Sequence, residues 1–335
     1  NKISIDGPTS LSVSDNYKKR FESYGWAFQE INGHNEKDIS KAIKKSLNSK
    51  KPNLISCKTI IGYGSPNKAG KSSSHGAALG EDEVELVRKK LKWNYRPFDI
   101  PKEILKEWRK IGEKGILEEK KWNKIYSKKN KKIKNELQRV VNDKLPKKFD
   151  KIIYALKQKI FNLKPNIASR QSSASVLEEI IKTLPELIGG SADLSGSNNT
   201  STKLSLPIKP GNFNGNYIHY GVREHAMAGI MNGMALHKGI VPYGGTFLVF
   251  LDYCKPSVRL SSLMGLKVIY VFSHDSIGLG EDGPTHQPIE HLTHLRAVPN
   301  LNVFRPADTI ETLECWELAL KNSNTPSVIA LSRQK

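Results

Sequence analysis

Short apolar runs alternate with amphipathic segments along most of the chain, which is typical of a parallel α/β fold. The first third contains the apolar runs ISI and YGWAFQEI, then the helical pattern KDISKAIKKSLNSK, and then a predicted strand at 53–60. A Gly/Ser/Asn-rich loop, GYGSPNKAGKSSSHGAALG, and the amphipathic segment EDEVELVRKKLKW follow. Loops of this length in compact domains are often functional, so we expect the loop to carry part of a site.

A second set of strands and helices occupies the last half of the chain. Helices are predicted in REHAMAGIMNGMALHKG, TFLVFLDYCKPSVRLSSLMG and DTIETLECWELALKNS. The predicted strands span 186–190, 216–220, 240–244, 267–273, 302–306 and 327–332. This alternation predicts an open parallel sheet with helices on both faces.

The segment from 101 to about 165 is charged, helical in pattern and poor in strands, which predicts a connector between domains. The formal net charge of the chain is +20, and lysine concentrates here, in KKWNKIYSKKNKKIKNELQRVVNDKLPKKFDK. We interpret this segment as a solvated helical connector, with a polyanion-binding segment as the alternative. No RNA-binding or DNA-binding motif accompanies the lysines, so we expect no nucleic-acid partner.

Hydropathy and cysteine content limit the location of the protein. No apolar run approaches the roughly 20 residues that a membrane helix requires, so we expect no membrane partner. The three cysteines, Cys57, Cys254 and Cys315, have neither metal-ligand spacing nor the spacing of a disulfide framework. We expect a reducing compartment, the cytoplasm. A plastid stays open, because the chain starts at Asn1 and we expect it to begin inside a domain.

Polar residues follow most of the predicted strands of the last half. In an open parallel sheet, the carboxyl ends of the strands form the ligand crevice, so we expect one edge of the sheet to gather the chemistry. In strand order, these residues are Ser191 and Asp193, Arg223 and Glu224, His274 and Asp275, Arg305 and Asp308, and Arg333.

Several blocks of the sequence resemble transketolase, in the order in which that family carries them. They are CKTIIGYGSPNKAG, SSHGAALG, ASRQSSA, GGSADLSGSN, NYIHYGVREHAM, HDSIGLGEDGPTHQP and LSRQ. The resemblance implies an α/β fold with two parallel-sheet thiamine-diphosphate-binding domains, the first incomplete, joined by a charged helical connector. It implies the C-terminal part of the diphosphate-binding domain at 1–134, the connector at 135–165 and the pyrimidine-binding domain at 166–335. We expect a central fragment that lacks the family's C-terminal domain and its Gly-Asp-Gly motif.

The resemblance also implies an activity. Transketolases use thiamine diphosphate to transfer a two-carbon ketol unit reversibly from a ketose phosphate, such as xylulose 5-phosphate, to an aldose phosphate, such as ribose 5-phosphate. The implied metal is Mg²⁺, with Ca²⁺ as an alternative, and the implied assembly is a homodimer with active sites across its interface. A relative similar to dihydroxyacetone synthase and an inactive dimerisation fragment are the alternatives.

For the cofactor, the resemblance assigns Glu224 to the aminopyrimidine ring, where it promotes the tautomer that takes up the thiazolium proton. Phe247, Phe250 and Tyr253 have the spacing of one helical face, which is typical of a core, but their match assigns them to the pyrimidine pocket. His75 and Asp193 are further cofactor-binding candidates. Asn1 and Ile3 match the metal-binding segment, through a side-chain oxygen and a backbone carbonyl.

For the sugar phosphate, the matching positions are Arg170, Ser197, His274 and Arg333, and guanidinium groups suit a phosphate because they offer a rigid charged fork. His75, Asp282 and His286 resemble residues between cofactor and substrate, with Asp282 accepting a hydrogen bond from an acceptor hydroxyl. His286 is also a catalytic candidate. The separations of the histidines match no compact zinc motif.

The helix expected after Glu224 is rich in small residues, which permit close backbone approach. Glycine inside a helix costs about 1 kcal/mol relative to alanine, so a packing reason is expected. Packing on the sheet and contact with a second subunit both explain the pattern, and the two-fold architecture of the resembling family favours the subunit contact. The residues are Ala226, Ala228, Gly229, Gly233 and Ala235.

Overall fold

Residues 122–335 form the larger of two units in the computed structural model, which describes residues 1–335. Their six-stranded sheet is parallel throughout, in the order β6-β5-β7-β8-β10-β9. The strands are β5 (Leu187–Ser191), β6 (Tyr217–His219), β7 (Val241–Phe247), β8 (Ile269–Ser273), β9 (Asn302–Phe304) and β10 (Ser327–Leu331). The six strands expected from the pattern are thus confirmed. β6 lies on one side of β5 and β7 lies on the other, so the strand order changes direction at β5. Parallel sheets bind ligands at such a topological switch point.

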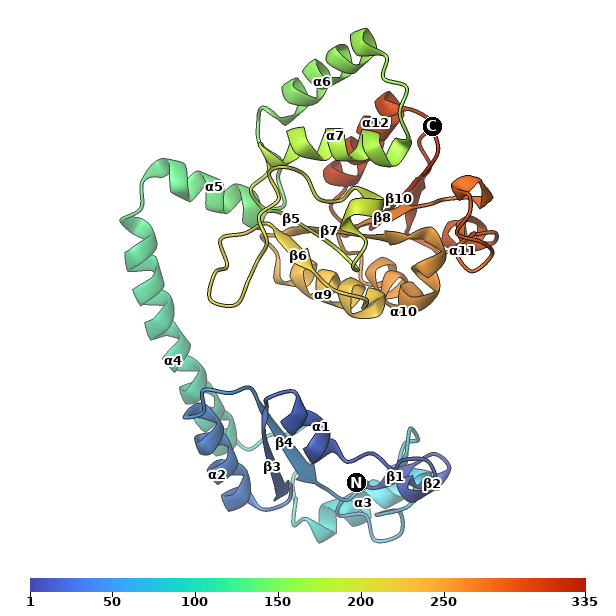
Figure 1. The fold of residues 1–335 in the computed structure, drawn as a ribbon. Helices are drawn as coiled ribbons and strands as arrows, with labels where there is room; N and C mark the ends of the chain where they lie inside the picture. The colour runs from blue at the N-terminus through green and yellow to red at the C-terminus, as the bar shows by residue number, and fades with distance from the viewer. The chain divides into compact units, whose positions relative to one another are not determined.

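Helices cover both faces of this sheet, as predicted (Figure 1). One face carries α6 (Phe149–Leu163), α7 (Ser169–Ile181) and α12 (Thr309–Lys321), and the other carries α9 (Glu224–His237) and α10 (Leu251–Leu263). Strand side chains alternate between the faces, so Ile269 and Val271 join the first core and Tyr270 joins the second. Each fully buried large side chain stabilises the fold by roughly 1.5–3 kcal/mol.

Two adjacent glycines let helices and loops approach β7 closely. A Cβ atom on Gly244 would lie 2.4 Å from the Met231 sulfur on α9, and one on Gly245 would lie 2.5 Å from a Thr200 methyl group. Neither distance leaves room for a side chain. The glycine pair therefore sets the spacing of both layers around the strand that leads into the candidate site.

The helix predicted from Thr246 onward begins later than expected. Thr246 and Phe247 continue β7, where they pair with Phe272 and Ser273 of β8, and a 3-10 helix at Leu248–Phe250 precedes α10. A continuous apolar run suits a buried parallel strand and a buried helix equally, and pairing with β8 decides between them here. The prediction that Phe247 shares a helical face with Tyr253 is therefore wrong.

Residues 1–121 form the smaller unit. β3 (Ala27–Asn32) and β4 (Asn53–Lys58) pair in parallel and are joined by α2 (Glu36–Leu47), which confirms the expected βαβ pattern. The run ISI does not join this sheet, because β1 (Ile3–Ser4) pairs antiparallel with β2 (Gly7–Pro8). The other elements are α1 (Tyr17–Ser23), α3 (Glu81–Lys90) and two 3-10 helices, Thr9–Leu11 and Ser72–Ser74.

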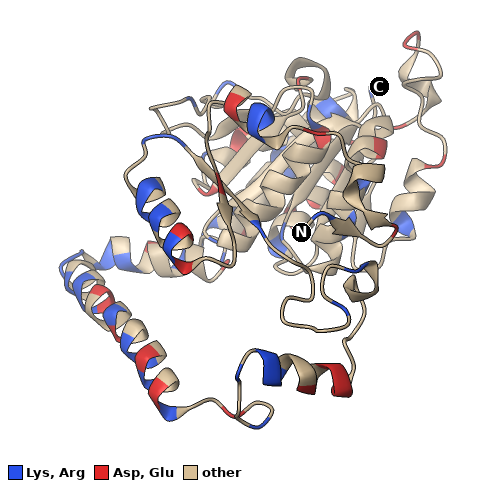
Figure 2. Ribbon diagram, turned by 90° about the horizontal axis from the view of Figure 1, so that it is seen from below, with Lys and Arg blue, Asp and Glu red and all other residues tan.

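The segment expected to be a helical connector, 101–165, contains α4 (Lys102–Ser127) and α5 (Lys131–Val141), neither of which has a buried residue. It also contains α6, which does not stay in solvent but packs into the core of the larger unit through Phe149 and Ile153. Figure 2 shows Lys and Arg interspersed with Asp and Glu along α4. The division between the two units falls inside α4, at 121–122. The elements that remain are α8 (Ser195–Asn198), α11 (His291–Arg296) and a 3-10 helix at Ile277–Leu279. No helix of the chain combines the length and the apolar character needed to cross a bilayer.

Candidate functional site

The carboxyl ends of four adjacent strands carry candidate residues of the larger unit. Asp193 follows β5, Phe247 ends β7, His274 follows β8 and Arg333 follows β10. Asp193 and His274 have positive φ angles of 64° and 59°. This conformation is uncommon for residues other than glycine, and it clusters at functional sites. The fold thus brings together, at one sheet edge, residues that are up to 140 positions apart in sequence.

A reciprocal link between two serines positions Arg170 and Arg333 at this edge. The backbone N–H of Ser332 donates to Ser169 Oγ at 2.7 Å, and the backbone N–H of Ser169 donates to Ser332 Oγ at 3.2 Å. Each serine directly precedes one of the arginines. The link therefore joins the start of α7 to the end of β10, and it brings Arg170 and Arg333 close enough for the charge of one to act on the other.

The two guanidinium groups are held by neighbouring loops. Arg170 Nη1 donates to the backbone carbonyl of Ser197, while its buried Nε has no hydrogen-bond partner. Arg333 donates to the carbonyl of Leu279, and its Nη2 lies 3.1 Å from a Glu281 carboxylate oxygen. Burial and the nearby Arg333 charge lower the pKa of Arg170. Two neighbouring guanidinium groups make a site that suits an anion.

His274 lies between these charges and the aromatic residues. It is 3% exposed, its ring stacks on Phe247 at a centroid distance of 3.7 Å, and its Nδ1 lies 2.9 Å from Ser273 Oγ. Burial, followed by the charges of Arg170 and Arg333, lowers the pKa of His274 to about 4. The imidazole is therefore neutral at pH 7, so it can donate one hydrogen bond and accept another.

The aromatic candidates form one surface although three different elements carry them. Phe247 and Phe250 are stacked at 5.6 Å with an interplanar angle of 11°, and the Phe250 and Tyr253 centroids are 5.7 Å apart. His286 meets Phe250 edge to face at 5.4 Å, and its Nδ1 lies 3.0 Å from Thr285 Oγ1. Such a surface can stack against a flat heterocycle.

Glu224 is the first residue of α9, where the positive end of the helix dipole favours a carboxylate. Its side chain is 6% exposed, and it accepts no hydrogen bond from the chain. Neither carboxylate oxygen is sealed from solvent, so the group is free to accept a hydrogen bond from a ligand. The amino group of an aminopyrimidine is such a donor, and so is its ring nitrogen in the protonated or imino form.

Three further candidates, His75, Asn1 and Ile3, lie in 1–121. His75 is exposed in the Gly/Ser/Asn-rich loop, directly after the 3-10 helix Ser72–Ser74. Asn1 Oδ1 accepts the backbone N–H of Ile3 at 2.9 Å. Mg²⁺ takes about six oxygen ligands, and no cluster of three His, Cys, Asp or Glu side chains in the chain could hold a metal ion. These residues do not amount to a complete metal site.

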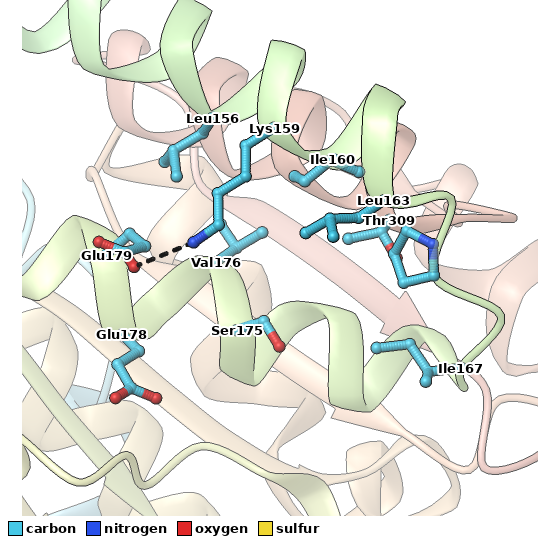
Figure 3. A pocket seen from close by; sticks show the side chains of 11 residues that line it. Leu156, Lys159, Ile160, Leu163, Ile167, Ser175, Val176, Glu178, Glu179 and Thr309 are labelled. Atoms are coloured by element: carbon cyan, nitrogen blue, oxygen red, sulfur yellow. Dashed lines mark ion pairs between the residues drawn. The ribbon is translucent and has the colours of Figure 1, made fainter.

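A cavity of about 360 Å³ lies between α6 and α7, away from the residues described above (Figure 3). Leu156, Ile160 and Val176 form apolar parts of its wall, and Lys159 points toward Glu179, with 4.0 Å between Nζ and Oε1. None of the candidate site residues lines it. The largely apolar lining offers no match to a sugar phosphate.

Some contacts of the site were not expected from the sequence. They are the ion pair of Arg333 with Glu281, the Ser273 contact to His274, and the stack of His274 on Phe247. The only feature of the sequence that pointed to Glu281 was its place beside Asp282 in GLGEDGP. The stack of His274 on Phe247 joins the end of β7 to the residue after β8, and no local pattern in the sequence predicts it.

Two family models together match nearly the whole chain. The model of the transketolase pyrimidine binding domain matches residues 165–335, and that of the transketolase thiamine diphosphate binding domain matches residues 1–146. These ranges correspond to the two parts of the chain that contain parallel strands.

Individual relatives agree with these matches. The chain is 50% identical over 336 residues to the transketolase of Sinorhizobium medicae, and 49% identical over 339 residues to that of Buchnera aphidicola. Both comparisons include 100% of this chain but only 48% and 51% of the relatives. The chain thus spans about half the length of the curated relatives it matches.

Solved structures give the same result. The chain is similar to transketolase from Leishmania mexicana, with a TM-score of 0.91 and 36% identity, and to Pichia stipitis transketolase in complex with sedoheptulose-7-phosphate, with a TM-score of 0.90 and 38% identity. These matches cover 100% of this chain, and 50% and 51% of the solved chains. The chain belongs to the transketolase family.

Proposed function

We propose that the enzyme carrying this chain transfers a two-carbon ketol unit between sugar phosphates, with a ketose phosphate such as xylulose 5-phosphate as donor and an aldose phosphate such as ribose 5-phosphate as acceptor. The observation that carries the proposal is the pair of arginines beside neutral His274 at the carboxyl edge of the sheet. A phosphate group there would accept hydrogen bonds from the guanidinium groups of Arg170 and Arg333. A relative bound to sedoheptulose-7-phosphate supports the substrate class.

The uncharged part of the sugar would lie toward the aromatic surface. His274 and His286 present imidazole groups that can donate to sugar hydroxyls or move a proton. Asp282 is exposed near His274, and its charge partly opposes the fall in the pKa of that histidine. We assign Asp282 to a hydroxyl of the acceptor, where an analogue without that hydroxyl would lose a hydrogen bond.

When bound, thiamine diphosphate would supply the electron-accepting chemistry that breaking a bond next to a ketose carbonyl requires. Glu224 would accept a hydrogen bond from the pyrimidine and hold the tautomer that moves a proton, while Phe247, Phe250 and Tyr253 would hold the ring in place. Asp193 is proposed to complete this pocket, and Ser197 to join Arg170 at the phosphate, while His75 stays a cofactor and substrate candidate within 1–121. Asn1 and Ile3 supply too few oxygens for Mg²⁺ or Ca²⁺, so we assign the metal no step.

The exposed face of α9 supports a homodimer. Ala226, Gly229 and Gly233 are exposed, and a Cβ atom added to either glycine would have no neighbour within 4 Å. Ala228, by contrast, is fully buried against the sheet. Packing on the sheet therefore explains Ala228 but not the glycines, and contact with a second copy of the chain accounts for their small size.

Glu224→Gln tests the proposed function. The amide has the same shape but cannot accept the hydrogen bond with a full negative charge, so turnover should fall by at least about 100-fold, as expected for loss of acid–base catalysis. The measurement is ketol transfer from xylulose 5-phosphate by the assembled enzyme, with saturating thiamine diphosphate and Mg²⁺, to ribose 5-phosphate and, in parallel, to formaldehyde.

Glu103→Gln is the matched control, because it also removes a carboxylate from the first turn of a helix, on exposed α4. It should leave turnover unchanged. Turnover of Glu224→Gln at the level of Glu103→Gln would contradict the role of Glu224, and a preference for formaldehyde over ribose 5-phosphate would contradict the acceptor class.

A further inference from the structure

A single buried carboxylate holds the start of the loop that carries His75. Glu83 lies in the first turn of α3 and is 7% exposed. Its Oε1 accepts hydrogen bonds from Ser65 Oγ and from the backbone N–H of Asn67, the latter at 2.9 Å, and its Oε2 accepts one from Asn67 Nδ2 at 2.9 Å. All three of these hydrogen bonds lie within 65–83, so the carboxylate joins the start of α3 to the start of the loop.

The hydrogen bonds continue from Glu83 to the residue before His75. Ser65 Oγ also accepts the backbone N–H of Lys68 at 2.9 Å, and the Lys68 carbonyl accepts Ser74 Oγ at 2.6 Å. Lys68 Nζ donates to the Leu79 carbonyl at 2.8 Å, which ties down the far end of the loop. An unbroken series of contacts thus runs from the carboxylate to Ser74.

We propose that Glu83 is a positioning residue for His75, acting through Ser65, Lys68 and Ser74. The inference rests on the proposed function only where it gives His75 a part in substrate binding. Whether Glu83 fixes the conformation of the loop does not depend on what the enzyme does. His75 itself is exposed and has no hydrogen-bonding side-chain partner, so the backbone on either side of it must define its place.

The charge state of Glu83 agrees with this role. Hydrogen bonds from Ser65 and Asn67 lower the pKa of Glu83 to about 2. The carboxylate therefore stays ionised over the pH range in which enzymes of this kind are assayed, and charge-assisted hydrogen bonds are stronger than neutral ones.

Amide hydrogen exchange of the chain tests the structural part. In Glu83→Gln the amide keeps one acceptor oxygen but replaces Oε2 with a donor that faces the donor Asn67 Nδ2. Exchange of the loop amides at 61–80 should become about tenfold faster or more, with β3 and β4 unchanged. Glu83→Leu, which keeps no acceptor, should show a larger change. Glu81→Gln is the matched control, since Glu81 is an exposed acid of the same first turn, and it should exchange like the unsubstituted chain.

Kinetics of the assembled enzyme test whether the effect passes through His75. Glu83→Gln should raise the KM for the sugar phosphate, and in a His75→Ala background it should cause no further rise, because the group that it positions is absent. Unchanged loop exchange, faster exchange throughout 1–121, or additive KM effects would each overturn the inference. If His75→Ala alone leaves KM unchanged, the proposed substrate role of His75 fails, while the exchange result still decides whether Glu83 positions the loop.

Discussion

At the scale of single residues, His274 reports on the charge around it. Burial and two guanidinium groups lower its pKa to about 4, so an anion bound between Arg170 and Arg333 should raise it. We expect titration with inorganic phosphate, followed by NMR of the imidazole, to move the pKa of His274 toward its ordinary value near 6.5. Arg333→Leu should raise the starting pKa and reduce the response to phosphate.

Exposed His237 provides the internal control and should not respond. If phosphate leaves the pKa of His274 unchanged, the anion site lies elsewhere.

The lowered pKa of His274 also affects the stability of the fold. Because the folded-state pKa lies below the unfolded-state value of about 6.5, the unfolded chain binds the extra proton first. This residue therefore lowers the free energy of unfolding as the pH falls from about 6.5 to about 4, and adds no further change below that.

At the scale of elements, a buried ion pair attaches α5 to the amino end of the sheet. Arg139 on α5 bonds both carboxylate oxygens of Glu186, at 2.7 and 3.0 Å, and the side chains are only 11% and 7% exposed. Arg139→Leu leaves a buried carboxylate without its partner and should lower the free energy of unfolding of the larger unit by about 3 kcal/mol, measured by urea denaturation.

Two further variants control for this effect. Replacing both Arg139 and Glu186 by leucine should recover most of the loss, because no charge is then left unpaired. Lys182→Leu breaks a half-exposed pair with Glu179 and should change stability by no more than about 0.5 kcal/mol. Equal losses for Arg139→Leu and Lys182→Leu would show that the buried pair contributes no more than a surface pair.

At the scale of the whole molecule, the two units differ in how much core they possess. No Leu, Ile, Val, Met or aromatic side chain of 1–121 is buried, whereas 122–335 contains two clusters of buried apolar residues. Limited digestion with trypsin should therefore cut the lysine-rich exposed helices α4 and α5 first, and then degrade 1–121 faster than the larger unit. Mass spectrometry should identify a resistant fragment that begins within or just after α5, before α6, and retains α6 and the sheet. Persistence of a fragment from 1–121 for as long as the sheet fragment would contradict this.

Local pattern was sufficient for most elements but not for the start of α10. Strands of the larger sheet are visible as short apolar runs bounded by polar or turn residues, and helices are visible because apolar residues recur near 3.6. Thr246 and Phe247 are the exception. Their apolar neighbours give no alternation, and only hydrogen bonding to β8 keeps them in the strand.

The sequence by itself determined the class of fold, the strands of the parallel sheet, and the edge at which polar residues would meet, because these depend on short-range periodicity and on a general property of parallel sheets. The tertiary structure alone decided the contacts within that edge. The Ser169–Ser332 link, the stack of His274 on Phe247 and the pairing of Arg333 with Glu281 each join segments that are distant in the chain. Such contacts have no local signature, since the free energy that forms them comes from packing the helices and strands that carry them.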